Sequence, residues 1–187
     1  IVDSPEFEKV FDKFAKTEAL PRIGVYRKIP ELELKDMYDA NGIERPEDPA
    51  AVIAGMYKPA TNMLLLSEKM LDVLDEEEFE DSPGGAMVGR NKATLIRHEF
   101  GHFIDEYLKA FGTEKQKRVR NTIVREFEKL SATGNYDGND WWTKYSMKDE
   151  AEFIAELFAM YTSPNEEVRN AIPSALQTLM RHWLGMT

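Results

Sequence analysis

Cysteine is absent from this chain of 187 residues, and its absence excludes several kinds of site. Without cysteine there are no disulfides, no zinc sites built from thiolates and no cysteine nucleophile. The absence does not indicate a compartment, because a chain without cysteine is compatible with oxidising and reducing surroundings alike.

Long apolar runs and an excess of positive charge are lacking as well. No stretch approaches the roughly 18 consecutive apolar residues of a membrane span, and no signal-peptide pattern is present. The 24 basic and 34 acidic residues give a net charge of −10. This balance argues against nucleic acid and anionic membranes as partners and would attract a cationic segment. The length predicts one domain, residues 1–187, and nothing in the pattern indicates an oligomeric state. The chain begins with Ile1 rather than Met, which indicates a trimmed chain or an excised domain.

Histidine is scarce, yet two of the three histidines lie in one motif, His98-Glu99-Phe100-Gly101-His102. In a helix, positions i and i+4 share a face, so both imidazoles can bind one zinc ion while Glu99 takes a proton from a zinc-bound water. A random shuffle of this composition gives the HExxH pattern roughly four times in a thousand, so the surrounding residues have to decide.

The surrounding residues favour a metal site. Residues 91–111 contain no proline and have apolar residues at helical spacing, with Gly112 as the stop. His98, His102 and Asp105 share the remaining stripe of this predicted helix. Two buried core histidines beside an ion-paired aspartate are the alternative, but an i,i+4 pair with Glu99 inside it favours zinc.

The rest of the pattern predicts an α+β domain with a small twisted sheet, helices packed beside it and a mostly helical C-terminal half. Ser4-Pro5 begins a helix with a stripe of phenylalanines, residues 23–26 form a strand, and residues 51–66 form a hairpin whose turn is 58–62. The acidic run 75–81 is expected to be solvated and 82–89 to be a flexible loop. Further helices are expected at 31–40, 68–74, 113–132 and 147–161, and after Pro164 and Pro173.

A catalytic zinc site needs a third protein ligand and one open position. A metzincin would have a histidine or aspartate six residues past His102, but Leu108 is there, and peptide deformylase would need a cysteine. Asp105 is better placed to hydrogen-bond an imidazole than to reach the metal, and an ion pair is an equally good interpretation of it. Glu152 and Glu156 share one face of the predicted 147–161 helix. A zinc ion would relieve their repulsion if one acid bound the metal and the other held a ligand histidine.

The segments HEFGHFIDEY and YSMKDEAEFIAELFAMY together resemble the catalytic domain of anthrax lethal factor and its relatives, which include the secreted pro-pro endopeptidases. These are gluzincin metalloproteases. The resemblance covers residues 94–162 most strongly and implies a zincin-like fold, a peptide substrate and secretion or delivery into a host cell. Lethal factor is much larger, so its delivery route and substrate do not carry over.

Position by position, the resemblance makes His98, His102 and Glu152 the ligands of one zinc ion per chain. It also makes Glu99 the general base and Tyr145 the electrophilic partner, and it places Glu156 behind a ligand histidine. Three aromatic residues of the preceding loop are expected to pack or to contact substrate rather than to react: Tyr136, Trp141 and Trp142. His182 is expected to be an ordinary residue of the C-terminal helix.

The expected activity is that of a zinc endopeptidase that binds an extended peptide along a hairpin edge, at Met63 to Leu66. Two alternatives remain open. One is a zinc-binding but catalytically idle domain for protein interaction, which would need neither Glu99 nor Tyr145. The other is a zinc hydrolase with a substrate other than a peptide.

Overall fold

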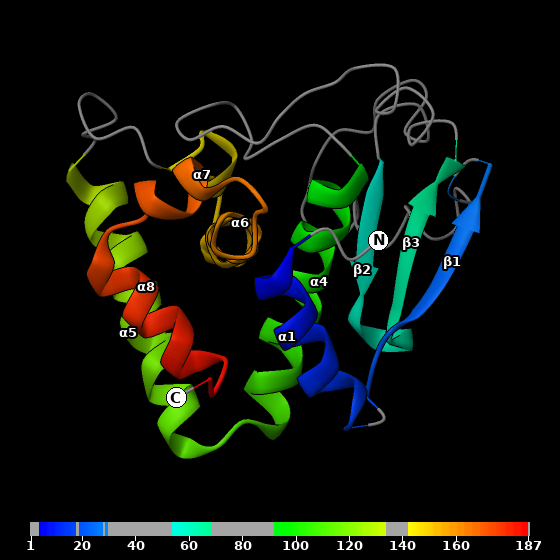
Figure 1. The fold of residues 1–187 in the computed structure, drawn as a ribbon, viewed down its shortest axis with the longest axis horizontal. Coiled ribbons are helices and arrows are strands. Elements are labelled where there is room, and N and C mark those ends of the chain that lie inside the picture. The colour runs from blue at the N-terminus through cyan, green and yellow to red at the C-terminus, as the bar shows by residue number, and fades with distance from the viewer. Residues whose placement is uncertain are drawn as a thin grey trace.

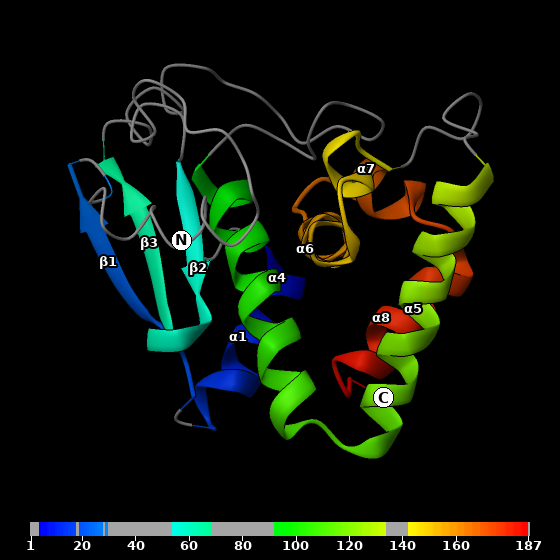
Figure 2. The ribbon, with the colours of Figure 1, turned by 180° about the vertical axis from the view of Figure 1, so that it is seen from behind.

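The computed structural model describes residues 4–17, 19–27, 29, 54–68, 92–133 and 142–186. Three strands lie together at one side of the molecule, and the helix α4 (Lys92–Phe111) lies between them and the other long helices (Figures 1 and 2). The architecture is therefore α+β, with a small sheet and a helical C-terminal half, as the sequence pattern predicts. No helix in the described part of the chain is long and apolar enough to cross a membrane.

The first helix, α1 (Pro5–Ala15), begins where the sequence predicts. The hydroxyl of Ser4 accepts a hydrogen bond from the backbone N–H of Phe7, and proline occupies the first helical turn, where its missing N–H costs nothing. Phe7 and Phe14 are buried and meet aromatic rings of α4 edge-on, Phe100 and Phe103 respectively. This apolar stripe attaches α1 to the helix that carries the HExxH motif.

The sheet has the strand order β1-β3-β2, with β1 (Arg22–Tyr26) parallel and β2 (Gly55–Lys58) antiparallel to β3 (Met63–Ser67). A short 3₁₀ turn, η2 (Pro59–Thr61), joins β2 to β3 and ends at Asn62, whose φ of 48° is left-handed. The predicted hairpin and its turn are confirmed. The predicted substrate edge at Met63–Leu66 is wrong, because β3 is the central strand and both of its edges are already paired.

The helical half consists of α5 (Glu114–Thr133), α6 (Glu150–Tyr161), α7 (Glu166–Ala171) and α8 (Ser174–Trp183). The helix α6 is buried over the whole run Phe153–Met160, so it is the central helix of the core. It begins at Glu150 rather than at the expected Met147, because Asp149 caps its N-terminus and a 3₁₀ turn, η3 (Tyr145–Met147), precedes it. The helices expected after Pro164 and Pro173 are present.

Several expectations lie outside the described residues. They concern the helices at 31–40 and 68–74, the acidic run 75–81, the loop 82–89, and Tyr136 and Trp141.

The approach of α4 to α6 depends on a glycine. A Cβ placed on Gly101 would lie 2.9 Å from Cα and 3.2 Å from the carbonyl oxygen of Ala155 on α6. Both are backbone atoms, which cannot move aside as a side chain can. The small residue in the motif thus sets how closely the two helices pack, and with it the distance between His98 and the carboxylates of α6.

We expect Gly101→Ala to destabilise the protein by roughly 1–3 kcal/mol, since overpacking forces the helices apart. At a free helical position the same change would instead stabilise by about 0.5–1 kcal/mol. The sign of the change in the free energy of unfolding, measured with urea, therefore distinguishes a tightly packed position from a free one. Ala110→Gly, at an exposed position of the same helix, gives the baseline for helix propensity. A Gly101→Ala protein as stable as wild type would contradict the packing argument.

Candidate metal centre

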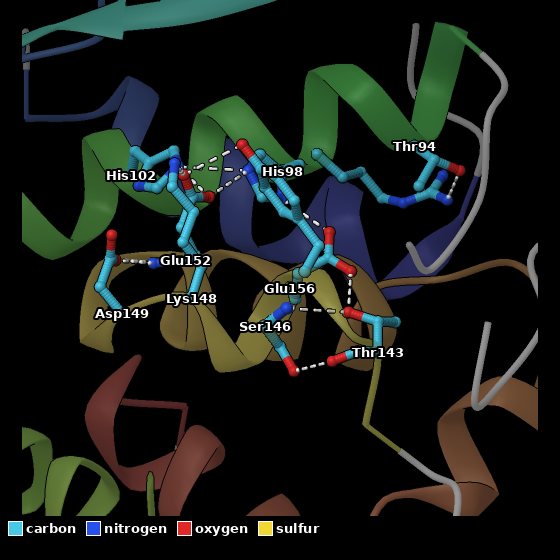
Figure 3. A network of polar contacts seen from close by, with 11 residues as sticks. Thr94, His98, His102, Thr143, Ser146, Lys148, Asp149, Glu152 and Glu156 are labelled. Atoms are coloured by element: carbon cyan, nitrogen blue, oxygen red, sulfur yellow. Dashed lines mark hydrogen bonds and ion pairs between the residues drawn. The ribbon is translucent and has the colours of Figure 1, made fainter. Parts of the chain in front are cut away.

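Two elements face each other at the candidate site. The helix α4 presents His98 and His102 one turn apart, and both rings point toward α6, His98 to Glu152 and Glu156 and His102 to Glu152 (Figure 3). His98 is 3% exposed, whereas His102 and Glu152 are partly exposed, so one side of the group is accessible. The α4 helix is the one predicted from the sequence, and the i,i+4 spacing of its histidines gives the shared face.

Three side-chain atoms form a tight triangle. Nε2 of His98 lies 3.1 Å and Nε2 of His102 lies 3.3 Å from Oε2 of Glu152, and the two Nε2 atoms are 3.2 Å apart. Ligands held 2.0–2.1 Å from a tetrahedral ion are about 3.3 Å from each other, so the triangle has the size of one face of such a site. This group could hold a metal ion.

Glu156 fixes the orientation of His98. Its Oε1 lies 2.8 Å from Nδ1 of His98, and its Oε2 accepts a hydrogen bond of 2.6 Å from the hydroxyl of Thr143. If Nδ1–H donates to this carboxylate, the lone pair of Nε2 faces the triangle, which is the tautomer that binds a metal. The contact expected between the second acid of α6 and a ligand histidine is therefore present.

The pKa shifts of His98 and Glu152 show how the buried carboxylates are compensated when the triangle holds no metal ion. Burial alone would lower the pKa of His98, but hydrogen bonds with Glu152 and Glu156 and the charge of Glu99 raise it from 6.5 to about 10. Burial alone would raise the pKa of Glu152, but hydrogen bonds with His102 and His98 hold it well below its usual range. Positive charge in the triangle compensates the buried carboxylates, and a divalent cation can supply that charge in place of a proton.

Glu99 lies where α4 faces β2, next to the two histidines but outside the triangle. It is 6% exposed and packs against β2, where a Cβ added to Gly55 would lie 3.2 Å from its Cγ. The backbone N–H of Tyr57 hydrogen-bonds to its carboxylate. Burial raises the pKa of Glu99, while the charges of His98 and His102 act in the opposite direction. Glu99 is thus a buried, oriented carboxylate with an increased affinity for protons.

The other oxygen of Glu152 receives two donors. The hydroxyl of Tyr145 and Nζ of Lys148 each lie 3.1 Å from Oε1. Burial, together with the charge and the hydrogen bond of Glu152, raises the pKa of Tyr145, so its phenol stays protonated and can donate. The structure therefore brings Tyr145 to the same carboxylate as the two histidines, although this residue is distant from the HExxH motif in sequence.

Asp105 does not contact an imidazole, so that interpretation of it is wrong. Its carboxylate, 1% exposed, accepts two hydrogen bonds from Arg120 of α5, at 2.7 and 2.9 Å, and pairs with Lys109 at 2.9 Å. Arg120 also reaches Glu150 at the start of α6, at 3.2 Å. Asp105 thus takes part in an ion network that ties α4, α5 and α6 together, which is the alternative that the sequence left open.

Two residues at the site were missed from sequence. Lys148 is four residues before Glu152, a spacing that can signal an ion pair but is common on any helix surface. Thr143, fully buried two residues before Tyr145, carried no recognisable signal. Trp142, expected to pack or to contact substrate, packs against the main core. His182, expected to be an ordinary residue of the C-terminal helix, lies in the last turn of α8.

No protein-family model matches the chain, and a search of curated proteins finds no significant match.

Binding of a divalent metal ion such as zinc should displace a proton from His98, since Nε2 cannot hold a proton and a metal together. Affinity should therefore rise about tenfold per pH unit as the pH increases toward His98's pKa of about 10. In the metal-free protein, the stability from protonated His98 is fully present below pH 6.5 and is lost as the pH rises through about 10.

Calorimetric titration with zinc in two buffers of different ionisation enthalpy measures the released proton. His182→Ala removes the histidine outside the site and should leave the proton release unchanged. Equal binding enthalpies in both buffers for the wild-type protein would show that no proton leaves.

Proposed function

We propose that the protein is a zinc-dependent endopeptidase with a zincin-like fold, related to the lethal factor-like gluzincins. The observation that carries the proposal is the triangle of His98, His102 and Glu152, with Glu99 and the Tyr145 hydroxyl beside it. The sequence resemblance over residues 94–162 names the same five residues. The expected secretion or delivery into a host cell depends on that resemblance alone.

The donor set supports zinc, or another late transition metal, over calcium and magnesium. Imidazole nitrogen suits zinc and other late transition metals, whereas calcium and magnesium prefer sites made entirely of oxygen. The group has three protein ligands, which leaves one position open, as in catalytic rather than structural zinc sites. When bound, zinc supplies a Lewis acid and lowers the pKa of water in its open position to about 7.

Glu99 has the properties of a general base. Its raised pKa increases its proton affinity, and the N–H of Tyr57 orients its carboxylate. We propose that it accepts a proton from the attacking water and returns it to the amine of the departing peptide. A residue with this role must lie beside the metal without ligating it, and Glu99 is outside the triangle.

Tyr145 would stabilise the developing negative charge. Its phenol remains neutral because burial and Glu152 raise its pKa, so it keeps a proton to donate. In the present structure that proton goes to Oε1 of Glu152. Donation to the oxyanion of the tetrahedral intermediate is worth roughly 3–4 kcal/mol for a well-placed group.

The extended substrate is proposed to lie along β2 rather than β3. The backbone N–H of Ser67 donates a hydrogen bond to the carbonyl of Ala54. In the antiparallel register of β2 and β3, hydrogen-bonded pairs alternate with non-bonded pairs, so the backbone N–H and C=O groups of Gly55 and Tyr57 point away from β3. The N–H of Tyr57 already serves Glu99 on that side. This edge therefore borders the catalytic carboxylate directly.

We expect Glu99→Gln to keep the fold and the zinc but to lose nearly all peptidase activity, because the amide cannot accept the proton. Profiling a peptide library with zinc-loaded wild-type and zinc-loaded Glu99→Gln protein gives the direct comparison. Peptides cut by the wild-type protein alone identify the substrate. A domain that binds zinc but is catalytically idle would cut none with either protein, and equal cutting by both would rule out the proposed base.

Tyr145→Phe should lower kcat by about 10²–10³ while zinc affinity and stability stay close to wild type, since only the oxyanion donor is lost. Tyr161→Phe, on a half-buried tyrosine at the far end of α6, is the matched control and should have full activity. An unchanged kcat in Tyr145→Phe would show that the phenol only packs and has no catalytic role.

A further inference from the structure

Thr143 occupies an unusual position between the turn that carries Tyr145 and the centre of α6. Its side chain is fully buried. Its hydroxyl accepts a hydrogen bond of 3.1 Å from the N–H of Ser146 and donates one of 2.6 Å to Oε2 of Glu156. The hydroxyl of Ser146 in turn donates to the carbonyl of Thr143 at 2.7 Å. One side chain therefore closes the η3 turn and contacts the core acid.

The contact continues to the proposed metal centre. Glu156 uses its other oxygen, Oε1, for Nδ1 of His98 at 2.8 Å. The four groups form one line of hydrogen bonds, from the backbone of Ser146 through Thr143 and Glu156 to His98 (Figure 3). The Thr143 hydroxyl has a single hydrogen and gives it to Oε2 of Glu156. If Nδ1–H of His98 donates to Oε1, the carboxylate accepts at both ends and Thr143 and His98 are held through the same acid.

We propose that Thr143 is a positioning residue, whose hydroxyl orients His98 through Glu156 and holds the turn of Tyr145 against the same centre. This inference rests on the proposed metal site and adds a residue to it. The residue would not touch metal or substrate. It would set the direction of one ligand and the place of the oxyanion donor together, so the turn and the ligand could not shift independently.

The role belongs to the hydroxyl and not to the shape of the side chain. Valine has nearly the same shape but cannot donate, so Thr143→Val leaves Oε2 of Glu156 buried without this donor. Serine keeps the hydroxyl and loses only a methyl group. The pair Thr143→Val and Thr143→Ser therefore separates hydrogen bonding from packing.

Thr162→Val is the matched control. Thr162 is also fully buried and lies at the other end of α6, where its hydroxyl donates to the carbonyl of Phe158 at 2.7 Å. Removing this hydroxyl costs a buried hydrogen bond of similar kind but lies away from the triangle. We expect Thr162→Val to lower the free energy of unfolding without changing the affinity for zinc.

The experiment measures zinc affinity by competition with a chromophoric chelator, the visible absorption spectrum of the cobalt(II)-loaded protein, and unfolding by urea. Thr143→Val should bind zinc at least about tenfold more weakly, since loss of support behind a ligand typically costs 10–100-fold. Its cobalt spectrum should shift, because that spectrum depends on ligand geometry. Thr143→Ser should match the wild type in both, and Thr162→Val should lose stability only.

Thr143→Val with wild-type affinity and spectrum would overturn the proposal, and so would a Thr143→Ser protein that behaves like the valine variant. Thr143→Ala, which removes the hydroxyl without retaining the branched shape, replaces Thr143→Val if that protein does not fold. Failure of the wild-type protein to bind zinc or cobalt would instead refute the proposed metal centre itself, so the two failures are distinguishable.

Discussion

The close packing of α4 against α6 is the constraint on which the site depends. Gly101 permits it, because any larger residue would meet the backbone at Ala155. At this separation, the histidines of α4 lie within hydrogen-bond distance of Glu152 on α6. The apolar groups around the contact, including those that α1 adds to α4, hold the two helices in a fixed register. Core packing thus converts two separate sequence motifs into one group of donor atoms.

The same packing buries or half-buries several acids, and each has partners of its own. A buried carboxylate costs several kcal/mol unless it is paired and hydrogen-bonded. Each acid is paired by different groups. Asp105 binds a guanidinium and Glu99 a backbone N–H. Glu156 contacts a hydroxyl and an imidazole, whereas Glu152 contacts two imidazoles, a phenol and an ammonium group. Among these four acids of the described helices, only Glu152 combines contacts to two imidazole nitrogens with a partly exposed side, which is where a cation can enter.

Local signals in the sequence predicted the parts of this arrangement that are themselves local. The helix of the HExxH motif, the cap at Ser4 and the hairpin with its turn at 58–62 each depend on residues within a few positions of one another. The start of α6 was expected three residues too early, because the side chain of Asp149 forms the cap while that of Ser146 bonds to the carbonyl of Thr143.

Features that depend on distant partners could not be predicted in the same way. The hairpin pattern does not show that β1 pairs with β3, so β3 was expected to have a free edge. The arginine that binds Asp105 is 15 residues away on another helix, and nothing in the sequence distinguishes Arg120 from the other arginines. Thr143 becomes significant only once α6 places Glu156 beside it.

X-ray absorption at the zinc edge tests the central claim most directly. The account predicts that protein loaded with one equivalent of zinc shows two imidazole nitrogens at about 2.0–2.1 Å, with oxygen completing the coordination. His98→Ala protein should show at most one imidazole. A zinc site with oxygen ligands only, or an unchanged imidazole signal in His98→Ala, would contradict the assignment of His98, His102 and Glu152 as the metal centre.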